Sequence, residues 1–377
     1  MPSLRDFLLT TLNEVEHVID MHTFYVKRSL NLLDPLMIQP YLGFGNATQV
    51  TLQGRLLENE GIETPRQGAS SWQNFKTMVH RYGSDEIPHA RIRAIFGDQE
   101  QVIETDAEGY FRVTFTGFTL PPADRIWYPM DLELLDSFHG QQETVKATGQ
   151  VIIPQKSEFG VISDVDDTIL VSHSADFVKK IQLTFMHNAK TRVPFEGVAS
   201  FYQALHQGSD RQHANPIFYV SSSPWNLYDL LKHFCEVHKI PKGPYMLRDI
   251  GLTDQHFIRS SHEKHKVAQI TQIFDTYPDM KFILVGDSGQ KDPEIYEGLT
   301  DQYAGSILGI YIRDVTHDAR DQEVRQIAEC VRERGIDMIL AYDTLEAAHH
   351  AVENQWIHAD CVDEIAAQVQ RDHQYNA

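Results

Sequence analysis

The chain has 377 residues, 42% of them hydrophobic, which is enough for about two or three domains with ordinary cores. Its 33 Lys and Arg against 53 Asp and Glu give a formal net charge of -20, which repels polyanions and excludes nucleic acid as an expected partner. The cysteines Cys235, Cys330 and Cys361 form no C-x-x-C pair, which disfavours a zinc or redox centre and favours a reducing compartment.

Residues 1–40 are predicted to contain an N-terminal amphipathic helix. Apolar residues recur there at spacings of three and four, beginning with Leu4, Phe7, Leu8 and Leu12. This stripe needs an apolar partner, either the next domain or a membrane interface, and the acidic residues Asp6, Glu14 and Asp20 disfavour anionic lipid. The start lacks a signal-peptide pattern, and no run reaches the ~20 apolar residues of a spanning helix. We therefore expect a cytoplasmic protein without a transmembrane segment.

Residues 41–154 change to a period of two, which predicts strands. The alternating apolar positions include Val50, Leu52, Leu56, Ala90, Ile92, Ala94, Phe96, Phe111, Val113 and Phe115, followed by Leu132–Leu134 and Val145–Ile153. Thr105–Gly109 is predicted to be a turn of hairpin type, and Gly61–Gln73 a long loop between strands. The expected fold of this domain is a small antiparallel β-sandwich.

Residues 155–345 alternate short apolar runs with helical stretches, which predicts a parallel sheet with helices on both faces. The predicted strands contain Val161–Ile162, Ile217–Val220, Tyr245–Leu247, Phe282–Val285, Ile307–Ile312 and Met338–Ala341. Ligands of such sheets bind at the carboxyl ends of the strands. Residues 346–377 are predicted to form a C-terminal helical tail.

The first strand of this region is followed by Asp164, Asp166 and Thr168 in the pattern D-x-D-x-T. Phosphoryl transfer through an aspartyl-phosphate needs one ionised carboxylate to attack phosphorus and a second acid to protonate the leaving oxygen. The pattern supplies both groups. Because a lone D-x-D is more often an acidic turn after a strand, this interpretation depends on the motifs downstream.

A serine motif, Ser221–Trp225, follows the second predicted strand of the sheet. Pro224 suits the first position of a helix and Ser223 its N-cap. Hydroxyls and backbone N–H groups at a helix start bind phosphate. The ordinary alternative is that the serines only cap a helix. Arg248 also follows a predicted strand and would lie at the same edge of the sheet.

Two further motifs lie close to the predicted strand Phe282–Val285. Lys266 opens an amphipathic segment before it, and Asp287 and Asp292 follow it in the pattern G-D-S-x-x-x-D. A solvated lysine and an acidic turn are the ordinary explanations. Four such motifs in this order, each beside a strand end, seldom occur together by chance, and they indicate a phosphate site.

Together these motifs resemble the haloacid dehalogenase superfamily of phosphatases, and more closely the catalytic domain of the actin-patch-associated phosphatidate phosphatase family. The resemblance rests on Asp164–Thr168, Val220–Trp225, Leu247–Asp249 and Gly286–Tyr296, and covers residues 155–345. It implies a haloacid-dehalogenase-like fold. The region upstream is also similar to the bacterial-type upstream domain of that family.

The resemblance implies a role for each matching residue. Asp164 would be the nucleophile, Asp166 the general acid and then base, and Lys266 a charge stabiliser, with Lys264 as a weaker rival for that last role. Ser221 would bind phosphate, with Ser222 and Ser223 as alternatives. The phosphate ester would also meet Arg248 at the strand ends.

Magnesium is the expected cofactor, because a hard cation with oxygen ligands neutralises the substrate and screens nearby carboxylates from each other. Asp164, Asp287 and the backbone carbonyl of Asp166 are its expected ligands. Asp292 would orient this shell or join it. The Asp166 side chain then stays free for proton transfer.

The segments Thr168–Ser221 and Trp225–Lys266 are too short for a large globular cap, so the site should admit a bulky or interface-bound substrate. The resemblance implies phosphatidate or a related membrane lipid phosphate; a protein or small-molecule phosphate is the alternative. Dehalogenase chemistry is disfavoured because attack on carbon does not need the acid at Asp166. An inactive binding module that uses the β-domain is disfavoured by the intact catalytic motifs. Nothing in the sequence indicates an oligomeric state.

Overall fold

The computed structural model describes residues 34–58, 87–120, 125–138, 144–166, 168–169, 195–248, 260–316 and 320–376. These residues belong to two compact units, and the boundary between the units falls between Ile153 and Pro154. The predicted loop Gly61–Gln73 and most of the predicted N-terminal helix lie outside the described residues. The last five residues of the range 1–40 form a strand instead of a helix.

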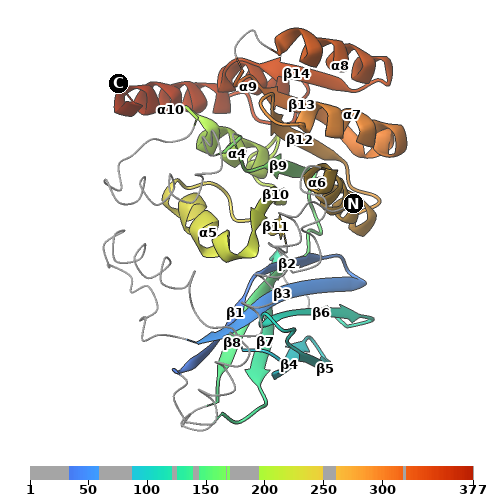
Figure 1. The fold of residues 1–377 in the computed structure, drawn as a ribbon. Helices are drawn as coiled ribbons and strands as arrows, with labels where there is room; N and C mark the ends of the chain where they lie inside the picture. Colours follow the sequence, from blue (N-terminus) through green and yellow to red (C-terminus); the bar gives the residue numbers. More distant parts are fainter. Residues whose placement is uncertain are drawn as a thin grey trace, which may run out of the picture. The chain divides into compact units, whose positions relative to one another are not determined.

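The first unit contains eight strands joined by hydrogen bonds in one sheet (Figure 1). In chain order they are β1 (Leu36–Pro40), β2 (Leu42–Gly45), β3 (Gln49–Glu58), β4 (Arg91–Phe96), β5 (Gln99–Glu104), β6 (Tyr110–Thr116), β7 (Trp127–Leu134) and β8 (Lys146–Ile152). The strand order is β1-β3-β2-β8-β7-β4-β5, with β6 on the other edge of β3. Neighbouring strands are antiparallel except for the parallel pair of β2 and β8.

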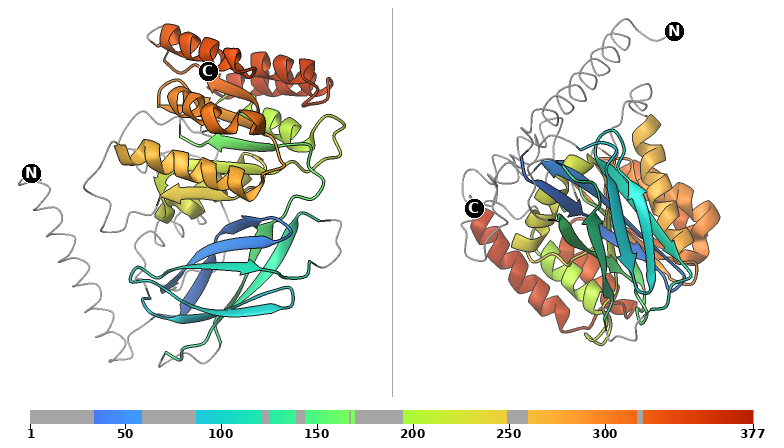
Figure 2. Two further views of the ribbon diagram at one scale, coloured as in Figure 1. Left: turned by 90° about the vertical axis from the view of Figure 1, so that its right-hand side faces the viewer. Right: turned by 90° about the horizontal axis from the view of Figure 1, so that it is seen from below.

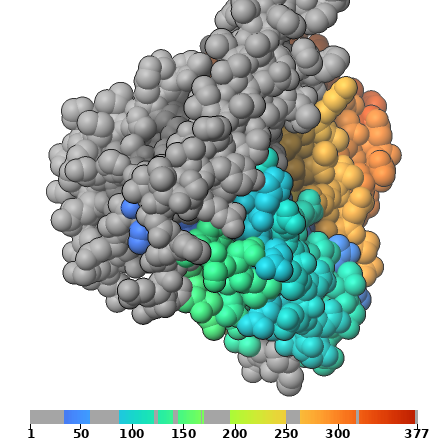
Figure 3. All heavy atoms as spheres, turned by 60° about the horizontal axis from the view of Figure 1, so that its bottom comes forward, coloured from blue at the N-terminus to red at the C-terminus, as the bar shows by residue number. Residues whose placement is uncertain are grey.

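The strands that were predicted to form a small antiparallel β-sandwich are all joined in this one sheet, in which the longest strand, β3, has several partners. It pairs with β1 and β2 along one edge and with β6 along the other. Gln101 of β5 donates to the carbonyl of Thr114 in β6 at 3.0 Å, so the two ends of the sheet approach each other. The alternating apolar side chains, such as Ile92 and Phe115, turn inward to one common core. The outward side chains of β4–β8 are visible as the cyan to green surface in Figure 3.

The turn at Thr105–Gly109 is present, with Gly109 in the left-handed region at φ 76° and its N–H donating to the carbonyl of Asp106. The prediction that it closes a hairpin is wrong. β5 pairs with β4, and β6 pairs with β3. The turn therefore carries the chain from one end of the sheet to the other.

The second unit contains a six-stranded parallel sheet in the order β11-β10-β9-β12-β13-β14. Its strands are β9 (Gly160–Asp164), β10 (Ile217–Pro224), β11 (Tyr245–Arg248), β12 (Phe282–Asp287), β13 (Ile307–Arg313) and β14 (Asp337–Ala341). All six predicted strands are confirmed. The central strands β9 and β12 are buried along their whole length, which is the pattern of a sheet covered on both faces.

Helices cover both faces of this sheet. They are α4 (Val198–Gln207), α5 (Tyr228–Val237), α6 (Ser260–Thr276), α7 (Asp292–Tyr303), α8 (Asp321–Glu333), α9 (Thr344–Glu353) and α10 (Cys361–Asn376), with 3-10 turns η1 (Trp225–Leu227) and η2 (Ala304–Ser306). Figure 2 shows α6 and α7 on one face and α4, α5 and α10 on the other. Helix α8 packs beside α7, and α9 beside α4 and α10. Among the described residues, no helix is both long and apolar enough to cross a bilayer.

The chain order of the strands reverses between β9 and β12. From β9 the chain proceeds through β10 to β11 on one side, and from β12 through β13 to β14 on the other. Such a switch point leaves a crevice at the carboxyl ends of the two central strands. The fold therefore places Asp164 and Asp287, the last residues of β9 and β12, at this point.

The prediction that Ser223 caps a helix beginning at Pro224 is wrong. Strand β10 continues through both residues, and Pro224 is extended at φ -73° and ψ 156°. A residue before proline avoids the helical region, which keeps Ser223 extended as well. The N–H of Ser223 donates to the Ser221 hydroxyl at 2.9 Å instead.

Candidate active site

Asp164 lies at the end of β9 with 1% of its surface exposed. The ammonium of Lys266, on α6, lies 2.7 Å from Asp164 Oδ1. The hydroxyl of Thr168 donates to Asp164 Oδ2 at 3.3 Å. The carboxylate is therefore fixed by a cation and a hydroxyl at the carboxyl edge of the sheet.

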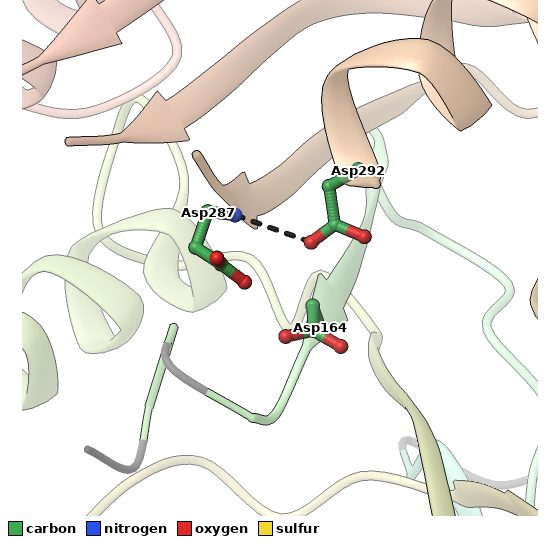
Figure 4. A group of neighbouring side chains, drawn as sticks. All are labelled: Asp164, Asp287 and Asp292. Carbon is green, nitrogen blue, oxygen red and sulfur yellow. Dashed lines mark hydrogen bonds between the residues drawn. The ribbon is translucent and has the colours of Figure 1, made fainter. Parts of the chain in front are cut away.

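Asp287 and Asp292 complete a group of three buried carboxylates (Figure 4). One oxygen from each of these and Asp164 lies within 4.8 Å of the others. Asp292 Oδ2 accepts the N–H of Asp287 at 3.1 Å, and its Oδ1 forms an ion pair with Lys266. Asp287 Oδ1 accepts the N–H groups of Gly289 and Gln290 at 2.7 and 2.8 Å.

Three buried carboxylates face one buried ammonium in this cluster, and the pKa values reflect the imbalance. Burial raises the pKa of Asp164 well above its usual value, Lys266 opposes this, and the charges of Asp292, Asp166 and Asp287 raise it further. Burial alone would lower the pKa of Lys266, but Asp164 and Asp292 raise it, so the ammonium stays charged. Excess buried negative charge on hard oxygen donors is the chemistry that fits a divalent cation such as Mg²⁺.

Asp166 lies in a different environment two residues after Asp164. Its Oδ2 accepts a hydrogen bond from the Ser221 hydroxyl at 2.7 Å, and its side chain is only half-buried. Its backbone carbonyl accepts from Gln290 Nε2 at 2.9 Å. The structure thus brings Asp166 and Ser221 together, and it also ties the Asp166 backbone to the loop that follows β12.

The other two predicted substrate ligands lie farther along the same edge. Ser222 is half-buried in β10, and Arg248 ends β11, where it pairs in register with Pro224. Arg248 therefore lies one strand beyond the serines and two strands from Asp164.

Sequence reasoning gave no role to Gln290 and Arg320. Gln290 bonds both to Asp287 and to Asp166, and Arg320 Nη1 donates to the Gln290 carbonyl at 2.5 Å. Gln290 lies inside the motif Gly286–Tyr296, close to Asp287, which is an expected metal ligand. This position in the motif could have predicted a role for Gln290 in the site. Arg320 stands in no motif, and only the fold brings it here.

Comparison with known proteins identifies this region. Residues 159–314 match the family described as phosphatidate phosphatase APP1, catalytic domain. Over 280 residues, 73% of this chain and 46% of the relative, the chain is 31% identical to phosphatidate phosphatase APP1 of Saccharomyces cerevisiae. Over 244 residues, 64% of this chain and 38% of the relative, it is 25% identical to an uncharacterized protein of Schizosaccharomyces pombe.

The chain spans less than half the length of both relatives. Among solved structures, a carbohydrate acetylesterase from Xanthomonas citri aligns over 78% of this chain and 72% of that chain, at 11% identity and a TM-score of 0.25. That similarity is too low to inform the fold. The sequence match and the strand-end carboxylates agree, and residues 159–314 belong to the family of phosphatidate phosphatase APP1 catalytic domains.

Proposed function

We propose that this protein is a Mg²⁺-dependent phosphatase that hydrolyses phosphatidate or a related lipid phosphate through an aspartyl-phosphate. The main support is the pair of carboxyl groups in different environments at the end of β9. Asp164 is buried against Lys266, whereas Asp166 is half-buried and bonded to Ser221. Lys266 and a cation bound by the carboxylate cluster would keep Asp164 ionised as the nucleophile, whereas Asp166, whose side chain lies outside that cluster, would be the proton donor.

In the first half-reaction an Asp164 oxygen attacks phosphorus, and the bond from phosphorus to the ester oxygen breaks. The protonated Asp166 gives its proton to that leaving oxygen, so the alcohol departs neutral. Lys266 balances the negative charge that Asp164 and the phosphoryl group bring into the buried site. Ser221 holds the Asp166 carboxyl toward the reacting group.

In the second half-reaction water attacks phosphorus of the acyl-phosphate, and the bond to the Asp164 oxygen breaks. Asp166, now ionised, takes the proton from that water. Inorganic phosphate leaves, and both carboxyl groups return to their starting states.

Asp164, Asp287 and the carbonyl of Asp166 would hold Mg²⁺, which when bound supplies Lewis-acid neutralisation of the phosphoryl oxygens. The Asp166 carbonyl keeps a second lone pair beside its bond to Gln290. Asp292 forms an ion pair with Lys266 through one oxygen and accepts the N–H of Asp287 with the other. We therefore assign Asp292 to positioning Lys266.

The test measures phosphate release from p-nitrophenyl phosphate, a phosphopeptide and phosphatidate in mixed micelles, with Mg²⁺ and with a chelator. We expect Mg²⁺-dependent release, with phosphatidate the preferred substrate. Asp164→Asn should lower kcat by a factor on the order of 10⁴ or more, because an amide cannot form the acyl-phosphate. The exposed Asp363→Asn serves as the matched control.

Hydrolysis that survives chelation, or that survives Asp164→Asn, would overturn the mechanism. Hydrolysis of the phosphopeptide or the aryl phosphate without any release from phosphatidate would instead replace the lipid by another phosphate monoester.

A further inference from the structure

Gln290 contacts two groups of the proposed metal site. Its N–H donates to Asp287 Oδ1 at 2.8 Å, and its side-chain Nε2 donates to the backbone carbonyl of Asp166 at 2.9 Å. In the proposed function, Asp287 and that carbonyl are two of the three ligands of Mg²⁺. One of them lies at the end of β12 and the other just beyond the end of β9. A residue outside the ligand set therefore joins ligands from the two central strands.

The bond from the Gln290 side chain defines the direction of the Asp166 carbonyl. A carbonyl oxygen has two lone pairs, so it can accept from Gln290 and bind a metal ion at the same time. Because a carbonyl can only accept, Gln290 must present its amide nitrogen here, which fixes the orientation of its side chain. Mg²⁺ demands near-ideal octahedral geometry, so its affinity depends on how accurately each ligand is held.

Arg320 fixes Gln290 in turn. Its Nη1 donates to the backbone carbonyl of Gln290, and its Nη2 forms an ion pair with Glu294 in the first turn of α7. Arg320 is the N-cap residue of α8, and 16% of its side chain is exposed. The planar guanidinium holds both acceptors in a fixed geometry. The loop after β12 is therefore tied to α7 and to the start of α8, which keeps Gln290 facing Asp166.

We infer that Gln290 is a positioning residue that aims the Asp166 carbonyl at the metal ion, and that Arg320 acts through Gln290. Both residues would set the affinity for Mg²⁺ without touching the substrate. The bond reaches the Asp166 backbone and not its carboxyl group, so proton transfer would be unchanged. The inference rests on the proposed function and identifies what determines its metal affinity.

The test measures Mg²⁺ binding without substrate, from the rise in melting temperature with Mg²⁺ concentration. Gln290→Met has a side chain of similar length that donates no hydrogen bond, and it keeps the N–H that binds Asp287. Its Kd for Mg²⁺ should rise about tenfold, and the Mg²⁺ concentration for half-maximal hydrolysis of p-nitrophenyl phosphate should rise equally. At saturating Mg²⁺ its kcat should stay within about threefold of the parent.

A double-mutant cycle tests the role of Arg320. Arg320→Gln should raise the Kd for Mg²⁺ about threefold, in the same direction as Gln290→Met. If Arg320 acts through Gln290, the double variant should bind Mg²⁺ no more weakly than Gln290→Met alone. Additive losses in the double variant would overturn the role of Arg320.

The matched controls are Gln326→Met and Arg332→Gln, at exposed positions on α8. Both should bind Mg²⁺ like the parent. Melting temperatures in chelator establish that each variant folds. Gln290→Asn replaces Gln290→Met if the latter does not fold. Its amide is one methylene shorter, so it should also lose the bond to Asp166 and raise the Kd.

A folded Gln290 variant that binds Mg²⁺ like the parent would overturn the inference. A lower melting temperature in chelator with an unchanged Kd would overturn it too, because Gln290 would then only stabilise the fold. A parent protein whose melting temperature does not respond to Mg²⁺ would instead overturn the metal site of the proposed function, and the inference with it.

Discussion

At the scale of single residues, the two carboxyl groups of the D-x-D pattern are separated by their surroundings. Asp164 is buried beside Lys266 and two more carboxylates, whereas Asp166 is half-buried and receives the hydroxyl of Ser221. Alternation along an extended chain keeps residues i and i+2 close in space. In the proposed mechanism this spacing would present both groups to one phosphorus, and their different neighbours would give them different roles.

The role of Asp166 predicts a dependence on the leaving group. Asp166→Asn removes the proton donor, and we expect kcat for an alkyl phosphate to fall by a factor on the order of 10²–10⁴. The fall should be much smaller for p-nitrophenyl phosphate, because nitrophenolate leaves without protonation. Single-turnover rates on both substrates measure this. Equal losses would remove Asp166 from the role of general acid.

At the scale of elements, the six parallel strands were predictable because each is a continuous apolar run, the signature of strands buried on both faces. The edge strand β5 was missed because polar residues alternate with few apolar ones and half of its residues are exposed. The extension of β10 through its serines was missed because Ser-Pro resembles a helix start. Local patterns cannot show which strands pair, and so the hairpin prediction failed at Thr105–Gly109.

The residues of the site that stand in local sequence motifs were predictable, and the others were not. Asp164, Asp287 and Lys266 stand in local motifs, and the structure brings them together. The contact of Arg320 with Gln290 depends on the three-dimensional arrangement of distant segments, which no local sequence pattern shows.

At the start of helix α7, Asp292 packs closely against Gly286 of β12, and a substitution of Gly286 tests whether the site needs this close packing. A Cβ on Gly286 would lie 2.4 Å from Asp292 Oδ2 and 2.7 Å from its Cβ. Gly286→Ala should therefore displace Asp292 and, through it, Lys266. We expect kcat to fall at least tenfold, and the melting temperature to fall as well.

Gly298→Ala is the matched control, because a Cβ there meets nothing within 4 Å on the same helix α7. The Gly298→Ala variant should have a helix α7 that is more stable by about 1 kcal/mol, and its kcat should equal that of the parent. A Gly286→Ala enzyme with parental kcat would show that Asp292 does not need its position.

At the scale of the whole molecule, the chain carries a net charge of -20, whereas the proposed substrate is an anion. The negative electrostatic potential of the protein repels an anionic substrate, so cations close to the site must overcome this repulsion. Lys266 is shared by two carboxylates, and Arg313 of β13 pairs in register with Asp287. Binding of a divalent cation would neutralise the excess negative charge of the carboxylate cluster, which links metal binding to both substrate affinity and stability.

This linkage predicts how stability depends on pH. The raised pKa of Asp164, caused first by burial, means that the folded state binds this proton more tightly than the unfolded chain does. The contribution of Asp164 to the free energy of unfolding therefore falls as pH rises above the ordinary aspartate pKa of about 3.9. The raised pKa of Lys266 adds no slope here, because its stabilisation is fully present below its ordinary pKa of about 10.4.

Melting temperatures of parent and Asp164→Asn protein, measured in chelator and in excess Mg²⁺ from about pH 5 to about pH 8, test this. In chelator, the melting temperature of the parent should fall relative to Asp164→Asn as pH rises, because only the parent must ionise the buried carboxyl of Asp164. Mg²⁺ binds the ionised cluster, so its stabilisation of the parent should grow with pH. Two results together would contradict this prediction. The melting temperatures of parent and variant would change with pH in the same way in chelator, and the increase in melting temperature caused by Mg²⁺ would be the same at every pH. The Asp164 carboxyl would then not be the group that couples metal binding to folding.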